Sequence, residues 1–134
     1  MAIQYSTTHR NNSMADLTTD LGTTPYLLIY TGSAPANCGT AASGTLLASL
    51  ACSNPFAPAP SGGVLTASAI TSAAAAATGT AGYWRLCTSS AGTTVVAQGT
   101  VGVSGADLNF SGGVSFTSGE TIAVTSFTIT ATGA

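Results

Sequence analysis

The spacing of apolar residues changes at Pro25, which separates a short helical part of the chain from a long part made of strands. Before Pro25, Met14, Leu17 and Leu21 recur at intervals of three and four residues, as on one face of a helix. At 1.5 Å per residue this pattern predicts a single helix of about two turns.

Residues that favour helix ends lie on both sides of this pattern. Ser13 is suited to cap the helix, Asp16 follows three residues later as in a capping box, and Gly22 is suited to end it. Residues 1–12 are then expected to form an N-terminal arm, with Ile3 to Thr8 as a short strand or extended segment.

After Pro25 the pattern becomes that of strands. Tyr26 to Tyr30 is apolar at every position, which is typical of a strand covered on both faces. We expect an opposite sheet on one side of it and the N-terminal helix on the other. Further short strands are predicted over residues 45–52, 64–70, 82–88, 93–100, 107–110, 114–116 and 120–130.

The connections between these strands are rich in small and turn-forming residues. Residues 31–44 read as a long loop and residues 89–92 as a hairpin turn. Asn54 to Gly63 is Pro-rich and predicts a turn or extended connection that Phe56 anchors to the core. Ala73 to Ala77 has high helix propensity, but its Thr, Ser and Gly flanks favour something short or irregular.

The last predicted strand has an internal conflict in its apolar positions. Ile122 and Val124 share one face, whereas Phe127 and Ile129 share the other. A strand of period two needs a bulge, a bend or a change of neighbours to do this. Together these elements predict a mainly β fold: an antiparallel β-sandwich of jelly-roll type over residues 13–134, with one short N-terminal helix.

Charge is nearly absent from the chain. Only 4% of its 134 residues are charged, none is lysine, and 79 are Ala, Thr, Ser or Gly. Arg10 and Arg85 cannot supply the cationic surface that binds nucleic acid. No apolar run approaches the length of a membrane span, and we expect no secretory signal. Since charge protects free proteins from self-association, this composition suits a protein docked in many copies on a larger assembly.

The three cysteines are too few, and odd in number, for a disulfide framework. Cys52 and Cys87 fall within predicted strands and are interpreted as small buried apolar residues. Cys38 lies in a loop where pairing stays open. A reducing cytosol during folding fits this usage best.

Catalytic chemistry has little support in the sequence. His9 is the only histidine, and a triad with a serine and Asp16 or Asp20 would lack any nucleophile motif. Asp16 and Asp20 as a carboxylate pair are better explained as a solvated helix face. Asp107 and Glu120 lie in turns, where acidic residues commonly bond the backbone. We expect no enzyme, no metal site and no cofactor.

Aromatic residues leave a second class of function open. Tyr26, Tyr30, Tyr83 and Trp84 would suit a sugar-stacking platform on a carbohydrate-binding module. Against this, Tyr26 and Tyr30 lie in the strand that is covered on both faces, where packing in the core fits better. Arg85 alternates away from Trp84 and is expected to pair with an acidic group or with a partner surface.

The chain resembles a family of small proteins of tailed bacteriophages and prophages, the capsid cement or decoration proteins. The likeness extends over nearly the whole chain and is carried by structural motifs: Tyr5 to Thr8, Arg10 to Asn12, Leu28 to Gly32 with Pro35-Ala36, Phe56 to Ala59, Ser61 to Thr66, Ala77 to Ala81 with Trp84-Arg85, and Thr125 to Thr130. The chain departs from the family in its still lower charge and in its three cysteines.

This resemblance implies a jelly-roll module on the outside of an HK97-like shell, made in the bacterial cytoplasm. Its partner would be the major capsid protein, and it would act as a homodimer or homotrimer, with no active site. A tail or fibre component is the nearest alternative. In the N-terminal arm, Ile3, Tyr5, His9 and Arg10 are the candidate partner-binding residues, since a polar arm can add a strand to a neighbour's sheet.

Overall fold

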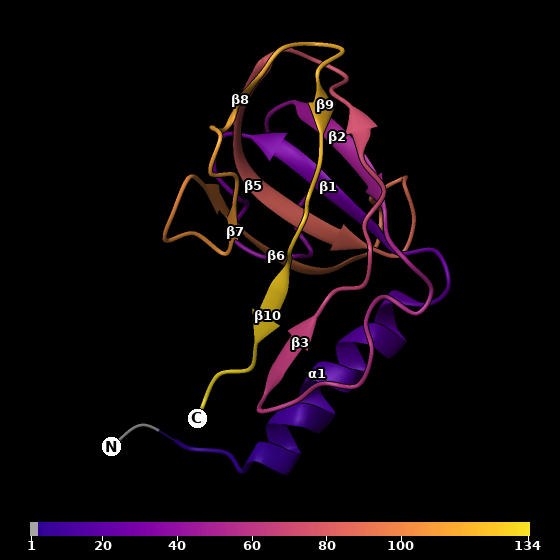
Figure 1. Ribbon diagram of the computed structural model, residues 1–134, viewed down its shortest axis with the longest axis vertical. Coiled ribbons are helices and arrows are strands. Elements are labelled where there is room, and N and C mark those ends of the chain that lie inside the picture. Colours follow the sequence, from indigo (N-terminus) through magenta and orange to yellow (C-terminus); the bar gives the residue numbers. More distant parts are fainter. Residues whose placement is uncertain (1–2) are drawn as a thin grey trace.

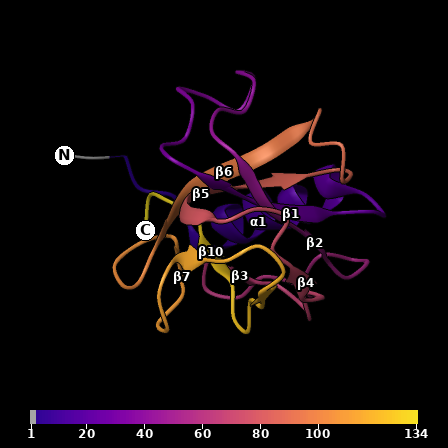
Figure 2. The same ribbon diagram turned by 90° about the horizontal axis from the view of Figure 1, so that it is seen from above.

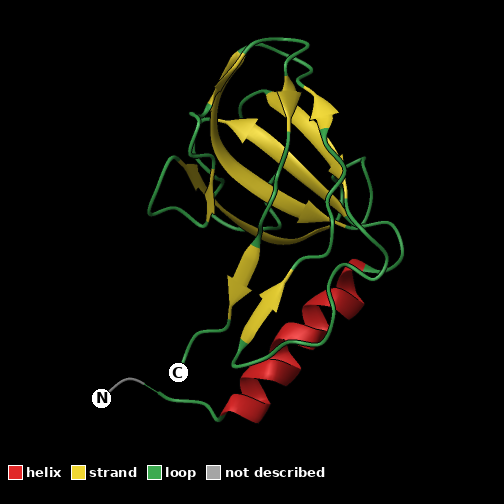
Figure 3. Ribbon diagram, in the orientation of Figure 1, coloured by secondary structure: helices red, strands yellow, loops and turns green. Residues whose placement is uncertain are grey.

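The computed structural model describes residues 3–134, which form a curled sheet, two small ribbons and one helix (Figures 1 and 3). Helix α1 spans Thr7–Leu21 and lies at one end of the molecule. The strands are β1 Tyr26–Thr31, β2 Leu46–Ala51, β3 Val64–Thr66, β4 Ala73–Ala74, β5 Gly79–Cys87, β6 Val95–Gly102, β7 Leu108–Asn109, β8 Ser115–Phe116, β9 Thr121–Ile122 and β10 Thr128–Thr130.

The main sheet has the strand order β2-β1-β5-β6-β7, and β8 pairs with the beginning of β5. All of its pairings are antiparallel except that of β6 with β7, which is parallel. Two ribbons, β3 with β10 and β4 with β9, lie outside this sheet. Over residues 3–134 the fold is therefore mainly β with one helix, as expected. Its main sheet is curled, and the antiparallel pattern has one exception.

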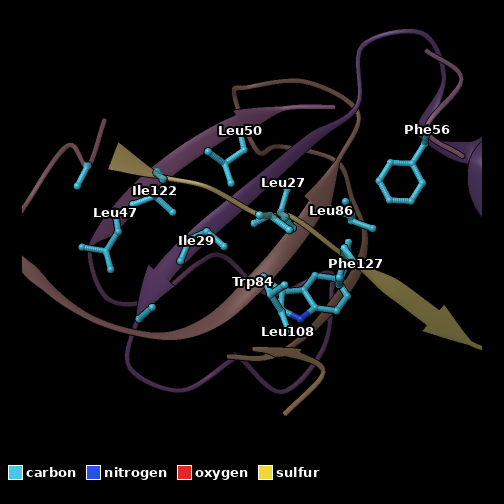
Figure 4. Packing of buried hydrophobic residues seen from close by; sticks show 14 of the residues in the cluster. Leu27, Ile29, Leu47, Leu50, Phe56, Trp84, Leu86, Leu108, Ile122 and Phe127 are labelled. Carbon is cyan, nitrogen blue, oxygen red and sulfur yellow. The ribbon is translucent and has the colours of Figure 1, made fainter. Parts of the chain in front are cut away.

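The first face of the sheet carries the main hydrophobic core (Figure 4). Leu27 and Ile29 of β1 lie opposite Leu86 and Trp84 of β5, and all four are buried. Phe127 closes this face, with its ring perpendicular to that of Trp84 at 4.9 Å between centroids. Phe56 meets the edge of Phe127, which confirms that the Pro-rich connection is anchored to the core.

The second face of the sheet is covered by loops and not by the helix. Residues 32–45 rise on the side opposite to β3, β4 and β10 (Figure 2). Tyr83 on this face donates from its hydroxyl to the carbonyl of Ser43 at 2.5 Å and accepts from the Ser43 amide at 3.0 Å. The strand at residues 26–30 is buried on both faces as predicted, but the expectation that the helix covers one face is wrong, because α1 packs against β3 and β6.

Helix α1 begins two turns earlier than the sequence pattern predicts. Ser6 caps it, its hydroxyl accepting from the amide of His9 at 3.2 Å. The predicted cap at Ser13 and the strand over residues 3–8 are therefore wrong, and residues 7–12 are helical. The predicted end at Gly22 is confirmed, and Met14, Leu17 and Leu21 do face the core.

The weaker predicted strands are shorter than expected. The segment 64–70 keeps only three paired residues in β3, and Ala73-Ala74 forms a strand and not a helix. The segment 120–130 divides into two strands that belong to different ribbons. β9 pairs with β4, and β10 pairs with β3. This change of neighbours explains the reversed apolar pattern, because Ile122 and Phe127 are both buried although they have opposite parity.

The hydroxyl of Tyr83 joins the long loop to the sheet, and its removal tests the covering of the second face. We expect Tyr83→Phe to lower the free energy of unfolding by about 1–2 kcal/mol, because the Ser43 amide and carbonyl lose their partner. Tyr26→Phe is the matched control, expected to change it by less than about 0.5 kcal/mol. Urea denaturation measures both, and equal effects would contradict the role of this bond.

Candidate functional site

The four residues predicted to bind a partner lie where the two ends of the chain meet. The amide of Tyr5 donates to the carbonyl of Gly133 at 2.6 Å. The Tyr5 ring packs over Gly133, where a Cβ would collide with it, and lies 4.9 Å from the ring of His9. The start of the described chain is thus fixed to the segment that follows β10.

Arg10 is part of the scaffold of this region. Its Nη1 donates to the carbonyl of Gly62 at 3.2 Å and its Nη2 to the hydroxyl of Thr7 at 3.3 Å. The side chain of the next residue, Asn11, accepts from the amide of Gly63 at 2.8 Å. Together these bonds hold the first turns of α1 against the turn before β3, so Arg10 is not a free cation in an arm.

Three of the four predicted residues share one surface hollow. Tyr5, His9 and Arg10 line it with Ser13 and Met14 of α1 and with residues 130–132, and its volume is about 360 Å³. Ile3 is not among its lining residues, and its side chain is 74% exposed. The structure therefore brings Tyr5, His9 and Arg10 together and leaves Ile3 as an apolar side chain in solvent.

Within residues 3–134, the hollow does not bring His9 together with an acidic side chain. His9 is exposed on α1, and neither Asp16 nor Asp20 lines the hollow beside it. Among residues 3–134, no three His, Cys, Asp or Glu side chains are grouped so as to hold a metal ion. Within the same range, no helix is both long and apolar enough to cross a membrane.

The acidic residues predicted to lie in turns bond the backbone of their surroundings. Oδ2 of Asp107 accepts from the amide of Thr100 at 2.9 Å, and Oε1 of Glu120 accepts from the amide of Thr117 at 3.0 Å. Both carboxylates therefore act in turn formation, as their positions in the sequence predict.

The aromatic residues do not form an open platform. Trp84 is buried against Phe127, and Tyr83 is fully buried with its ring stacked on that of Tyr30 at 5.1 Å. A sugar ring would need an exposed aromatic face, and neither Trp84 nor Tyr83 offers one. Tyr26 and Tyr30, for which packing in the core is predicted, are half-buried in β1.

Arg85 is buried, and the sequence interpretation gave it either an acidic group or a partner surface to pair with. It is 2% exposed, and its partners on the second face of the sheet are neutral. Nε donates to the Gln98 side chain at 3.1 Å, and Nη2 donates to the carbonyls of Thr40 and Asn37 at 2.8 and 3.4 Å. Gln98 in turn donates to the carbonyl of Pro35 at 2.8 Å. The expected acidic partner is not among these groups.

The cysteines are free in the structure. Burial raises the pKa of the Cys52 thiol from 9.0 to about 11, and burial also raises the pKa of the Cys87 thiol. Both thiols therefore stay protonated at neutral pH, as expected for cysteines that act as small packed side chains. Cys38 lies half-buried in the loop over the second face.

Comparisons of the chain with models of protein families, with curated proteins and with solved structures found no match.

Alkylation distinguishes the three thiols, because the thiolate is the reactive form. With iodoacetamide at about pH 8, we expect Cys38 to react first and Cys52 at least about tenfold more slowly, since a raised pKa removes thiolate. Peptide mass spectrometry follows each site over time, with urea-unfolded protein as the control in which the three rates converge. Equal rates for Cys38 and Cys52 in the folded protein would contradict this assignment.

Proposed function

We propose that this chain is a virion structural protein, a decoration protein on the outside of a tailed-phage capsid, where it binds the major capsid protein as a homodimer or homotrimer. The observation that carries the proposal is the distribution of charge over the folded surface. Resemblance to the cement proteins, carried by structural motifs along nearly the whole chain, supplies the identity of the assembly.

The β part of the molecule has almost no free charge. Arg85 is buried, while Asp107 and Glu120 bond backbone amides of their own turns. The remaining charged side chains, Arg10, Asp16 and Asp20, all lie on α1. Most of the outer surface therefore consists of Thr, Ser, Ala and Gly, which contact a partner through hydrogen bonds and apolar groups.

Such a surface suits a protein that is permanently attached to an assembly better than one that is a free monomer in solution. Mixed charge normally keeps soluble proteins apart, and this chain has little of it. A protein that binds only the assembled shell stabilises that shell by mass action at each site. Many symmetric copies then add modest contacts into a large total effect.

The exposed N-terminal residues are the proposed contact with the shell. Ile3 is 74% exposed and Tyr5 46% exposed, although both are large apolar side chains. They extend from a helix that is firmly held by Arg10 and Asn11. A rigid base with an apolar tip favours docking of residues before the helix on a neighbouring subunit.

A jelly-roll sandwich, which the resemblance implies, stays a prediction for the finer architecture. The curled sheet with two ribbons over its first face is compatible with a sandwich. The parallel pairing of β6 with β7 is the detail that such an architecture would have to accommodate.

Attachment to capsids tests the proposal. The purified chain, mixed with capsids from the phage or prophage that encodes it, is expected to sediment with them at a fixed ratio to the major capsid protein. Because few free charges are available, occupancy should change less than about twofold between about 50 and about 500 mM NaCl. Lysozyme of similar mass serves as the control for trapping. A chain that stays in the supernatant at every salt concentration would contradict the proposal.

Removal of the apolar tip tests the contact site. Deleting residues 1–12 is unsuitable, because it removes the Ser6 cap and the bonds of Arg10 and Asn11. The variant Ile3→Ser is expected to weaken capsid binding by about tenfold, as loss of one buried isoleucine side chain would. Thermal unfolding should be unchanged, because Ile3 is largely exposed. Full occupancy by Ile3→Ser would contradict the role of this tip.

A further inference from the structure

The second face of the sheet contains a buried cation whose charge is not balanced by any bonded acid. Arg85 keeps its charge in a protein interior, and burial of a charged group is strongly unfavourable unless hydrogen bonds and an opposite charge compensate it. Its partners are one amide side chain and two carbonyls. The four acidic residues lie elsewhere, two on α1 and two bonded within their own turns.

One nitrogen of this guanidinium is available for a further partner. Nε and Nη2 are engaged, whereas Nη1 donates to no group among residues 3–134. Nη1 is also not one of the unpartnered polar atoms sealed from solvent, which are Arg10 Nε, Thr18 Oγ1 and Trp84 Nε1. The guanidinium therefore has one nitrogen with no bonded partner among residues 3–134.

The Arg85 side chain lies at a hollow in the surface. The hollow has a volume of about 470 Å³, and Arg85 lines it together with Tyr30, Cys38, Thr40, Thr93 and Val95. The loop 38–42 forms one wall and the hairpin turn 91–93 another. None of its lining residues is acidic. The hydroxyl groups of Tyr30 and Thr93 can donate hydrogen bonds beside the cation.

We propose that this hollow is a binding site for a carboxylate. The carboxylate pairs with Arg85 and balances the positive charge that the neutral partners of Arg85 leave uncompensated. A carboxylate fits because a guanidinium pairs best with a planar group of two oxygens, which can accept from Nη1 and a neighbouring hydroxyl. The site is separate from the N-terminal hollow, and the inference does not depend on attachment to capsids. The carboxylate can come from a small metabolite or from a protein partner.

Thermal unfolding with simple carboxylates tests the site. Sodium acetate is expected to raise the Tm in a saturable manner, by about 4 °C at ten times its dissociation constant. Sodium chloride at the same ionic strength gives the baseline, and acetamide is the matched neutral molecule. No saturable rise with acetate, or an equal rise with acetamide, would overturn the proposal.

Two sets of variants locate the effect at Arg85. In Arg85→Gln the response to acetate should be lost. Arg85→Gln also removes bonds that hold the loop over the second face. Val95→Glu and Val95→Gln therefore form a second pair, which differs only in charge at a residue that lines the hollow. The internal carboxylate of Val95→Glu should occupy the site, so its Tm should exceed that of Val95→Gln and its response to acetate should be at least about tenfold weaker. Equal acetate responses in the two Val95 variants would overturn the site.

Model compounds distinguish the two sources of the carboxylate. N-acetylalanine presents the carboxylate of a chain end, and N-acetylaspartic acid amide presents an acidic side chain. Tighter binding of either compound than of acetate, by about tenfold, indicates a protein partner, and tighter binding of acetate indicates a small free acid. Amide signals of residues 38–42 and 91–93 in NMR titrations should shift in either case, and shifts confined to α1 would contradict the assignment.

Discussion

Burial of strands β1 and β5 on both faces is the constraint on which the rest of the fold depends. Residues 27–29 and 83–87 are buried without a break, so the sheet needs a cover on each side. The first cover is hydrophobic: Phe127 packs on Trp84, and Phe56 packs on Phe127. The second cover is a loop, which has no apolar run and is therefore held by hydrogen bonds from Tyr83, Arg85 and Gln98 to its backbone.

The sequence predicts those parts of this arrangement that depend on local pattern. Each of these features is determined by residues close together in the sequence. They are the apolar run at residues 26–30, the turn at 89–92, the helix end at Gly22 and the reversed apolar pattern after Val124. The start of α1 has only a weak local signature, because the Ser6 cap is followed by Thr and Asn, which are weak helix formers. Its first turns are stabilised by Arg10 and Asn11 through contacts 52 residues away.

The difference between local and long-range contacts also explains why one candidate site could be predicted from the sequence and the other could not. Tyr5, His9 and Arg10 were brought together as neighbours on one helix and its approach, which proximity in sequence makes easy to predict. The environment of Arg85 could not be predicted, since its partners are carbonyls of residues 37 and 40, and any residue carries a carbonyl. The useful sign in the sequence is a lone arginine within an apolar strand, in a chain with few acids to pair with it.

Low charge has opposite consequences on the outside and inside of this molecule. Outside, it removes the repulsion that keeps proteins apart and leaves a surface of hydroxyl and small groups, which favours lasting contact with an assembly. Inside, it leaves Arg85 without an acid, so that the loop over the second face is ordered around an unbalanced positive charge. A group that balances this charge binds only the folded loop, so its binding free energy adds to the stability of that cover. Binding of the proposed carboxylate and closure of the second face would thereby be linked through a single guanidinium.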